Sequence, residues 1–170
     1  MGGHHPSTLA AARGEPSYVW RSGQERRLRM IARWARLDGA RFLEAGCGIG
    51  TYSSQIARRF GARVEAFDVE LERVREAREE TPHALVAAAE AIPYPSAHFD
   101  TVLSNEVIEH VRDDRQAVAE MVRVLKPGGR IVLFCPNRWY PVEQHGHYWR
   151  GEYHFGNTPL INYLPDRWRN

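Results

Sequence analysis

The spacing of apolar residues predicts a series of amphipathic helices. The first begins at Gly23, and its apolar residues recur at i, i+3, i+4 and i+7: Leu28, Ile31, Ala32 and Ala35. Helical spacing returns at 52–60, 71–77 and 117–125. A glycine or proline follows each stretch within a few residues and favours a turn there. Helices of ordinary globular length are therefore expected along most of the chain.

Short apolar runs between these helices predict buried strands. The five runs are 41–45, 62–67, 84–88, 99–104 and 130–135. Strands that alternate with helices indicate βαβ units around a parallel sheet, the doubly wound α/β class. Ligands of such sheets bind beyond the carboxyl ends of the strands. Side chains that follow these runs are therefore the candidates for function.

Composition and charge narrow the class of protein. The chain has 170 residues, 43% of them hydrophobic and 26% charged, which is an ordinary balance for one globular domain. The net charge is +2, and its 22 arginines lie among acidic residues rather than in a basic stripe that would bind nucleic acid. No apolar run could cross a membrane and no signal peptide begins the chain, so we expect a cytoplasmic protein. Cys47 and Cys135 are expected to be reduced and buried.

The strongest local signal is a glycine-rich segment that follows the first predicted strand, LEAGCGIGT at 43–51. Gly46 and Gly48 allow a ligand to approach the backbone closely. Gly50 opens a helix whose free N–H groups can face a polar group. The glycines run G-x-G-x-G, and Thr51 stands where a nicotinamide-binding motif has its last glycine, which argues against a nicotinamide dehydrogenase.

Asp68 ends the second predicted strand, 18 residues after Gly50. A carboxylate at this place can accept hydrogen bonds from both hydroxyls of a ribose. The alternative is that Asp68 caps the following helix, which aspartate does well. Together with the glycine segment, the ribose interpretation is favoured.

In this order the motifs resemble those of the class I S-adenosylmethionine-dependent methyltransferases. The matching segments are the glycine motif 44–50, the second-strand acid Asp68, the adenine loop 89–94, the fourth strand 99–102 and the turn 125–129. The resemblance covers residues 40–137. It implies a three-layer Rossmann-like fold with five parallel strands in the order 3-2-1-4-5. It also implies S-adenosylmethionine as cofactor, S-adenosylhomocysteine as product, and a small-molecule methyl acceptor.

The resemblance also implies which residues bind the cofactor. Glu44 and the backbone of Gly46, Cys47, Gly48 and Gly50 would surround its methionine part. The remaining assignments are Asp68 for the ribose, Val69 packed on the adenine, Ala89 and Glu90 at the adenine edge, and Asn105 beside the sulfonium. Near the start of the chain, Tyr18 and Arg21 belong to a segment that folds over the cofactor in similar enzymes, where Arg21 would meet the carboxylate; surface packing is an equal alternative.

One position departs from the family pattern. The family often has an aspartate where this chain has Ala88, and that acid can accept a hydrogen bond from the adenine amino group. The bond is then left to the backbone, to water or to Glu90.

His110 is the candidate for acid–base chemistry. It follows the fourth predicted strand, and an imidazole accepts protons near neutral pH. A structural role in the same loop is an equal alternative. Glu106, Glu109 and His110 also form an E-x-x-E-H string, which binds a divalent cation in some relatives; metal binding is the third interpretation.

These observations divide the chain into three parts. Residues 1–22 form a partly flexible segment that covers the cofactor, 23–137 form the cofactor-binding core, and 138–170 form a tail rich in aromatic residues and histidine. The tail is a candidate lid over the acceptor. The family fold usually ends with an antiparallel pair of strands, for which no sequence remains, so we expect a shortened sheet. The expected function is methyl transfer, and the alternative is a non-catalytic cofactor-binding module or partner subunit.

Overall fold

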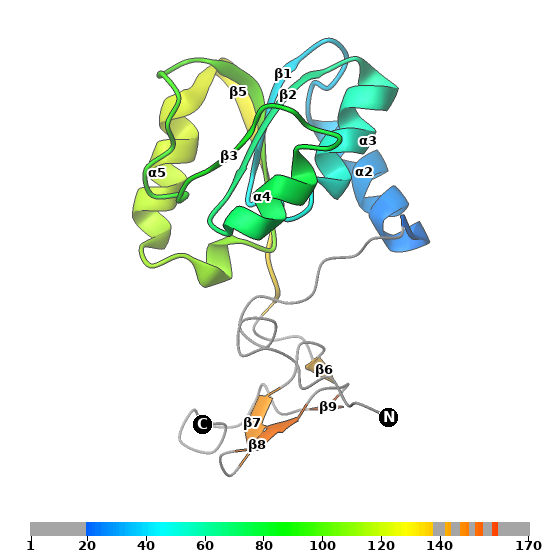
Figure 1. Cartoon of the computed structure of the whole chain (residues 1–170), viewed down its shortest axis with the longest axis vertical. Coiled ribbons are helices and arrows are strands. Elements are labelled where there is room, and N and C mark those ends of the chain that lie inside the picture. Colours follow the sequence, from blue (N-terminus) through cyan, green and yellow to red (C-terminus); the bar gives the residue numbers. More distant parts are fainter. Residues whose placement is uncertain (1–19, 138–141, 144–146, 150–151, 155–157, 160–170) are drawn as a thin grey trace. The chain divides into compact units, whose positions relative to one another are not determined.

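The computed structural model describes residues 20–137 and four short strands after them. Close contacts divide the chain into two compact units, one of Glu15–Cys135 and one of Met1–Gly14 with Pro136–Asn170. The first unit holds the five-stranded sheet and its helices (Figure 1). The four short strands belong to the second unit.

All strands of the five-stranded sheet run parallel. They are β1 (Arg41–Ala45), β2 (Arg63–Asp68), β3 (Ala84–Val86), β4 (Phe99–Asn105) and β5 (Leu125–Phe134). Their order across the sheet is β3-β2-β1-β4-β5, which confirms the predicted topology. The direction of winding reverses between β1 and β4. The carboxyl ends of these two strands are therefore where a doubly wound sheet binds its ligand.

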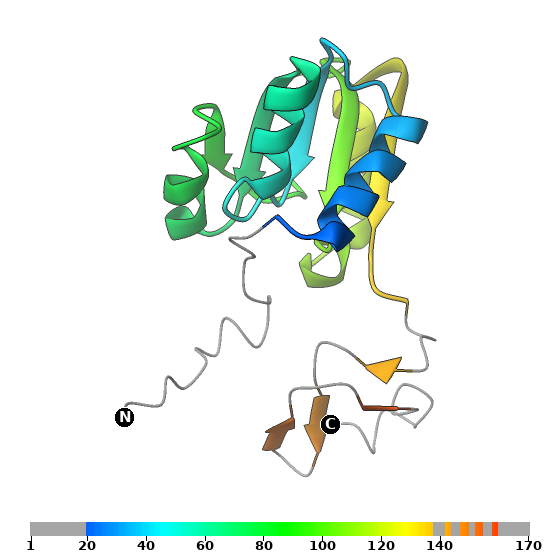
Figure 2. The ribbon, with the colours of Figure 1, turned by 90° about the vertical axis from the view of Figure 1, so that its right-hand side faces the viewer.

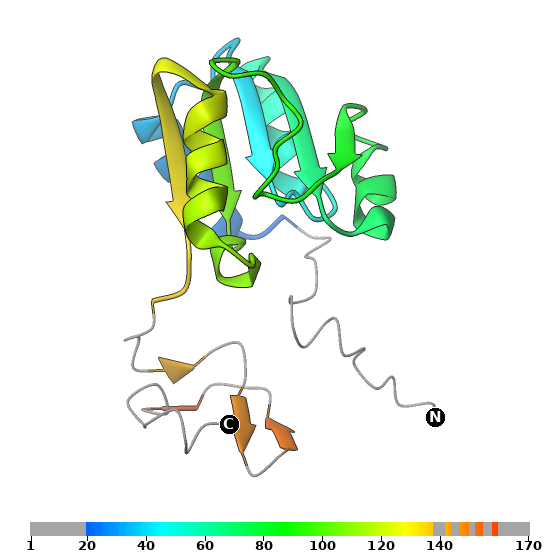
Figure 3. The ribbon, with the colours of Figure 1, turned by 90° about the vertical axis from the view of Figure 1, so that its left-hand side faces the viewer.

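Helices cover both faces of the sheet. They are α2 (Ser22–Trp34), α3 (Thr51–Phe60), α4 (Leu71–Ala77), the short 3₁₀ helix η1 (Ile108–His110) and α5 (Asp114–Val124). Figure 2 shows α2 and α3 in front of the strands, and Figure 3 shows α5 on the opposite face. Layers of helix, sheet and helix confirm the three-layer Rossmann-like arrangement.

Apolar clusters on both faces hold the layers together, and a smaller third cluster packs α4 against β2 and β3. On the first face Leu28 and Ile31 of α2 pack with Ile56 of α3 and Phe42 of β1. On the other face Met121 and Val124 of α5 pack with Phe67, Phe99 and other residues of the strands. Burying each such side chain contributes about 1.5–3 kcal/mol.

Not every apolar residue on the predicted helical faces is buried. Ala32 is exposed, as are Val118 and Val122 of α5. Each of these residues lies one position from a buried one, and a step of 100° around the helix is enough to leave the narrow buried stripe. Cys135 is also exposed, whereas Cys47 is buried, so the expectation of two buried thiols is wrong for Cys135.

The fifth strand begins earlier than predicted. Leu125 pairs with Phe99, and the next pairing joins Thr101 to Arg130, so residues 126–129 bulge out of the ladder. The turn expected at this point is therefore enclosed by the strand. Lys126 within the bulge forms an ion pair with Asp100 of β4, with 2.8 Å between Nζ and Oδ1.

In the second unit, β6 (Val142–Glu143) pairs with β9 (Thr158–Pro159), and β7 (His147–Trp149) pairs with β8 (Glu152–His154). Both pairs are antiparallel and form two small sheets of their own. Among the described residues, all strands of the five-stranded sheet are parallel. Within the same residues, no helix has the length and apolar character needed to cross a membrane.

Candidate cofactor site

The glycine segment forms the turn from β1 into α3, and its glycines are required for different reasons. Gly46, Gly48 and Gly50 all have positive φ, at 74°, 53° and 78°. A Cβ on Gly46 would overlap the Val107 side chain, so Gly46 allows two parts of the protein to meet. A Cβ on Gly48 would meet no atom within 4 Å, so the space beside Gly48 is open. Only the second observation fits the predicted close approach of a ligand.

Asp68 joins the glycine segment to the end of β2. Its Oδ2 accepts a hydrogen bond from the Gly48 N–H at 2.9 Å, and its Oδ1 accepts one from the Glu70 N–H at 3.0 Å. Only 7% of Asp68 is exposed. A carboxylate has about four acceptor sites, so about two remain for other donors. Asp68 therefore orders the turn before α4 and can still accept hydrogen bonds from the two hydroxyls of a ribose.

Glu44 is buried at the end of β1, with 2% of its surface exposed. Its Oε2 accepts hydrogen bonds from both the N–H and the hydroxyl of Ser53, the first at 2.9 Å. Burial raises the pKa of Glu44 to about 7, although the two Ser53 donors oppose this effect. A cationic ligand beside this carboxyl group would stabilise its ionised form, whereas the negative charge of Asp68 raises the pKa further.

The carboxyl end of β4 carries charged and exposed groups. Asn105 Oδ1 accepts a hydrogen bond from Arg27 Nη1 at 2.6 Å, and the same nitrogen lies 2.9 Å from Glu106 Oε1. Arg27 comes from α2 and also lies over the Phe134 ring, 5.0 Å from its centroid. Glu106 has a φ of 57°, an uncommon conformation for glutamate. Arg27 was not predicted, because nothing in the pattern of α2 separates it from the neighbouring arginines.

Tyr52 is a second residue that the sequence did not indicate. Its ring packs edge-on against Trp20, with 5.4 Å between the centroids. The residue is 5% exposed, and its hydroxyl has no hydrogen-bond partner within the described part of the chain. Burial raises the pKa of Tyr52, and the positive charge of Arg27 opposes this change. A buried donor without a partner close to Arg27 and Glu44 is able to bind a polar ligand group.

The predicted adenine-contacting residues lie at the ends of β2 and β3. Val69 is 51% exposed directly after Asp68, and it can pack against a flat apolar ring. Ala89 is buried. Glu90 Oε1 accepts hydrogen bonds from the N–H groups of Arg112, at 2.7 Å, and Asp113, at 3.4 Å. Partial burial opposes its ionisation, but these donors prevail and lower the pKa of Glu90.

The E-x-x-E-H string spans the end of β4 and η1. Glu109 and His110 are exposed, and the Glu106 carboxylate pairs with Arg27. Where the structure describes the chain, no three histidine, cysteine, aspartate or glutamate side chains converge as a metal site would require. His110 lies on the carboxyl side of the sheet, beyond Asn105.

The remaining predicted residues differ in how they are placed. Tyr18 lies outside the described residues. Arg21 is exposed, and its N–H donates to the Gln24 side chain at the start of α2. Cys47 is buried, its thiol lies 3.5 Å from the Gly48 carbonyl, and burial raises the pKa of this thiol. Gly50 is the N-cap of α3. The arginine that reaches the end of β4 is Arg27.

Comparisons with known proteins identify the family and the fold of the chain. Residues 43–133 match the family described as the methyltransferase domain. The chain is 31% identical over 81% of its length to a 2-methyl-6-phytyl-1,4-hydroquinone methyltransferase from Synechocystis, and 34% identical over 66% to a ubiquinone biosynthesis O-methyltransferase from Xylella fastidiosa. It spans 44% and 48% of these relatives. In structure it is similar to the [4+2]-cyclase SpnF, with a TM-score of 0.62, 27% identity, and coverage of 67% of this chain and 45% of the other.

Proposed function

The chain belongs to the class I S-adenosylmethionine-dependent methyltransferases, and from this premise we propose that it transfers the methyl group of S-adenosylmethionine to a small-molecule acceptor. The observation that carries the proposal is the hydrogen bond between Asp68 and Gly48. It places a carboxylate with free acceptor sites beside a backbone segment that has open space next to it. A ribose needs such acceptors, and the attached adenine and methionine parts need room on either side.

The residues around this bond fit the rest of the cofactor. Val69 and the backbone near Ala89 would contact the adenine. Glu44 would face the cationic methionine end, whose positive charge would favour the ionised carboxylate that burial disfavours. Arg27 and the unpartnered Tyr52 hydroxyl would bind the carboxylate, since both can donate hydrogen bonds. Asn105 would then lie beside the sulfonium.

The protein's contribution to methyl transfer is mainly one of position. S-adenosylmethionine supplies an electrophilic methyl group when it is bound. The chain has to hold the acceptor in line with that group and exclude water, and such alignment can account for most of the acceleration. Asn105 and Glu106 are fixed by Arg27 at the end of β4, so the wall of the site near the reacting atoms is ordered by α2.

An acceptor that is protonated at neutral pH also needs a base. We place His110 in this role, because its exposed ring can be reached by an acceptor and lies on the same side of the sheet as Asn105. The related enzymes act on a hydroquinone and on an intermediate of ubiquinone biosynthesis. A hydroquinone is therefore the first acceptor to test.

The decisive measurement is ligand binding by calorimetry and thermal shift. S-adenosylmethionine and S-adenosylhomocysteine should both raise the Tm, whereas NAD should not, because a ligand stabilises the native state that binds it. An acceptor screen with hydroquinones should follow, with S-adenosylhomocysteine as the measured product. Binding of NAD in place of the two methionine derivatives would refute the proposal.

A further inference from the structure

The connection between β3 and β4, residues 87–98, contains no helix or strand. It begins with three alanines, Ala87, Ala88 and Ala89, which have no polar side-chain atoms. Any polar recognition at this point has to come from backbone N–H and C=O groups. Backbone groups distinguish one ligand from another only when their positions are fixed. An irregular segment such as 87–98 therefore needs contacts that hold it in place.

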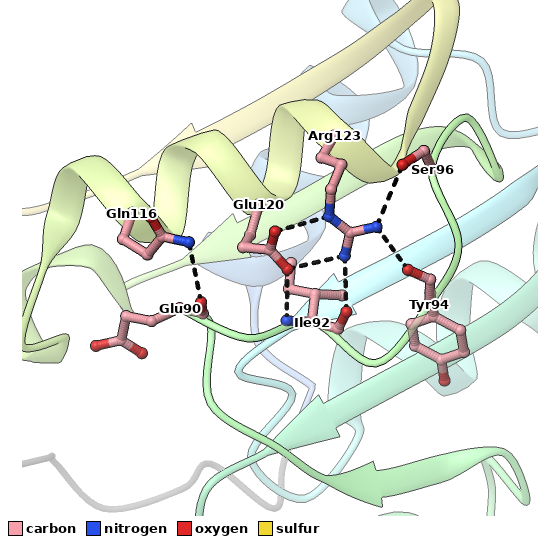
Figure 4. A network of polar contacts seen from close by, with 7 residues as sticks. All are labelled: Glu90, Ile92, Tyr94, Ser96, Gln116, Glu120 and Arg123. Carbon is pink, nitrogen blue, oxygen red and sulfur yellow. Dashed lines mark hydrogen bonds and ion pairs between the residues drawn. The ribbon is translucent and has the colours of Figure 1, made fainter.

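A polar stripe on α5 holds this connection. The stripe consists of Gln116, Glu120 and Arg123, which lie at i, i+4 and i+7 on one face of the helix. Figure 4 shows all three side chains directed toward the connection, where most of their partners are backbone atoms. Gln116 Nε2 donates to the Glu90 carbonyl at 3.4 Å, and Glu120 Oε2 accepts from the Ile92 N–H at 2.9 Å.

Arg123 makes the most contacts within the stripe. Its Nη2 donates to the Ile92 carbonyl and its Nη1 to the Tyr94 carbonyl, both at 2.8 Å. The same guanidinium binds both oxygens of Glu120, at 2.7 and 2.8 Å. Arg123 lowers the pKa of Glu120, which keeps the carboxylate ionised. The pair thus fixes the backbone of Ile92 on both its N–H and C=O sides, and it fixes the C=O of Tyr94.

The one acidic side chain at the start of the connection is already engaged elsewhere. Glu90 Oε1 accepts hydrogen bonds from two backbone N–H groups ahead of α5. These bonds tie the connection to the helix at a second point. They also direct one carboxylate oxygen toward α5, which leaves the backbone as the main polar surface of this segment.

We propose that the α5 polar stripe positions the backbone of residues 88–92 so that it reads the edge of the adenine base. Glu120 and Arg123 are then positioning residues for base specificity. The inference rests on the proposed function, which places the adenine beside this segment. Adenine presents an amino donor next to a ring-nitrogen acceptor, and a backbone C=O and N–H of residues 88–91 would match that pattern, since the N–H and C=O of Ile92 are already bound by Glu120 and Arg123. Hypoxanthine presents a carbonyl and a ring N–H, so the same pair would meet it with like groups.

The test compares binding of S-adenosylhomocysteine and S-inosylhomocysteine by calorimetry. The wild type should prefer the adenine compound. Arg123→Ala should weaken its binding by about 10-fold and remove most of the preference, because the carbonyls of Ile92 and Tyr94 are released. Arg123→Lys keeps the positive charge but loses the paired N–H donors, so its affinity and its base preference should lie between those of the wild type and of Arg123→Ala. This variant also provides a test if Arg123→Ala does not fold.

Arg75→Ala is the matched control. Arg75 pairs with Glu72 at the same i, i+3 spacing on α4, with 2.6 Å between nitrogen and oxygen, but the pair is exposed. Arg75→Ala should therefore leave the affinities for S-adenosylhomocysteine and S-inosylhomocysteine unchanged. The proposal would be overturned if both Arg123 variants kept the wild-type preference for the adenine compound. It would also be overturned if the variants lost affinity equally for the adenine and hypoxanthine compounds, because an equal loss indicates a purely structural role. A wild-type chain that binds neither compound would refute the proposed function itself, together with this inference.

Discussion

The carboxyl ends of β2 and β4 lie on opposite sides of β1, and their polar groups are held in different ways. At β2, Asp68 is buried and bound by backbone N–H groups from adjacent turns. At β4, Asn105 and Glu106 are partly or fully exposed and are bound by the Arg27 side chain from α2. The position of Asp68 at the end of β2 depends on local chain geometry, whereas the positions of Asn105 and Glu106 at the end of β4 depend on a long-range contact with Arg27.

This difference suggests a division of labour. Backbone donors in a turn cannot change rotamer, so the side of β2 suits a cofactor whose ribose is the same in every reaction. On the side of β4, Arg27 and Asn105 would meet the methionine end of the cofactor, whereas Glu106, held at a positive φ, and His110 are exposed and open to an acceptor that differs from enzyme to enzyme. The predictions below test the two sides, beginning with the largest expected effect.

The cofactor side should fail most completely in Gly48→Val. The branched side chain would fill the open space beside the turn and prevent measurable binding of S-adenosylmethionine, while the domain stays folded. Gly39→Val is the matched control, because Gly39 has a similar φ of 60°, is equally free of neighbours and lies before β1. Calorimetry and circular dichroism on both variants give the answer. If Gly48→Val still bound S-adenosylmethionine tightly, the glycine segment would be only a structural turn and not part of the binding site.

The acceptor side should respond most strongly in His110→Ala. If His110 is the base, turnover should fall about 10²–10⁴-fold while cofactor affinity stays nearly the same. His83→Ala, at another exposed histidine, should have no effect. A drop in Tm with a proportional loss of activity would instead indicate a structural role. Inactivation of the wild type by chelator, reversed by a divalent cation, would indicate a metal ligand.

Glu44 predicts a pH dependence on the cofactor side. Its pKa of about 7 in the folded chain exceeds the usual value of 4.5, so the native state binds more protons than the unfolded state between these pH values. Stability should therefore fall as the pH rises from about 4.5 to 7, by up to about 3 kcal/mol from this group.

Glu44→Gln should remove this slope and stabilise the unliganded chain at pH 8 by about 1–3 kcal/mol, while cofactor binding weakens. Urea unfolding at several pH values measures the effect. Glu79→Gln, at an exposed glutamate, serves as the control and should keep the wild-type profile. Identical profiles for wild type and Glu44→Gln would contradict the raised pKa.

The smallest expected effect separates the two interpretations of Asp68. Asp68→Ala should weaken S-adenosylmethionine binding by about 1–3 kcal/mol, the range for losing hydrogen bonds to a charged group. Asp113→Ala removes a carboxylate that also accepts a backbone N–H, at the start of α5, and should cost about 1 kcal/mol of stability without changing cofactor affinity. Equal behaviour of the two variants would make Asp68 a helix cap only.

The parts of the molecule that could be predicted from sequence are those set by short-range patterns. Apolar periodicity was enough for the alternation of strands and helices and for a parallel sheet with right-handed crossovers, whereas the strand order followed from the resemblance to a known family. The glycine segment and Asp68 could be identified because both lie within one turn of a strand end. By contrast, Arg27 is 78 residues from Asn105, and no spacing within α2 indicates that contact.

The α5 polar stripe was missed for a related reason. Gln116, Glu120 and Arg123 have the spacing of an ordinary solvated face, and on sequence alone they resemble one. Their partners are mainly backbone atoms of an irregular connection, which leave no trace in the pattern of side chains. Glu90 was predicted to border the adenine, and its bonds to the backbone ahead of α5 could not be foreseen either.

The central position of β1 has a consequence for the order of assembly. β1 pairs with β2, the next strand in the chain, and with β4, which follows only after β3. As the chain leaves the ribosome, the glycine turn, β2 and Asp68 are available to one another before β4 has been made. The other half of the sheet has to wait for the more distant pairing, which closes a longer loop and is slower to form. During synthesis, the glycine turn, β2 and Asp68 are therefore free to assemble first, and the end of β4 with Asn105 is added to them.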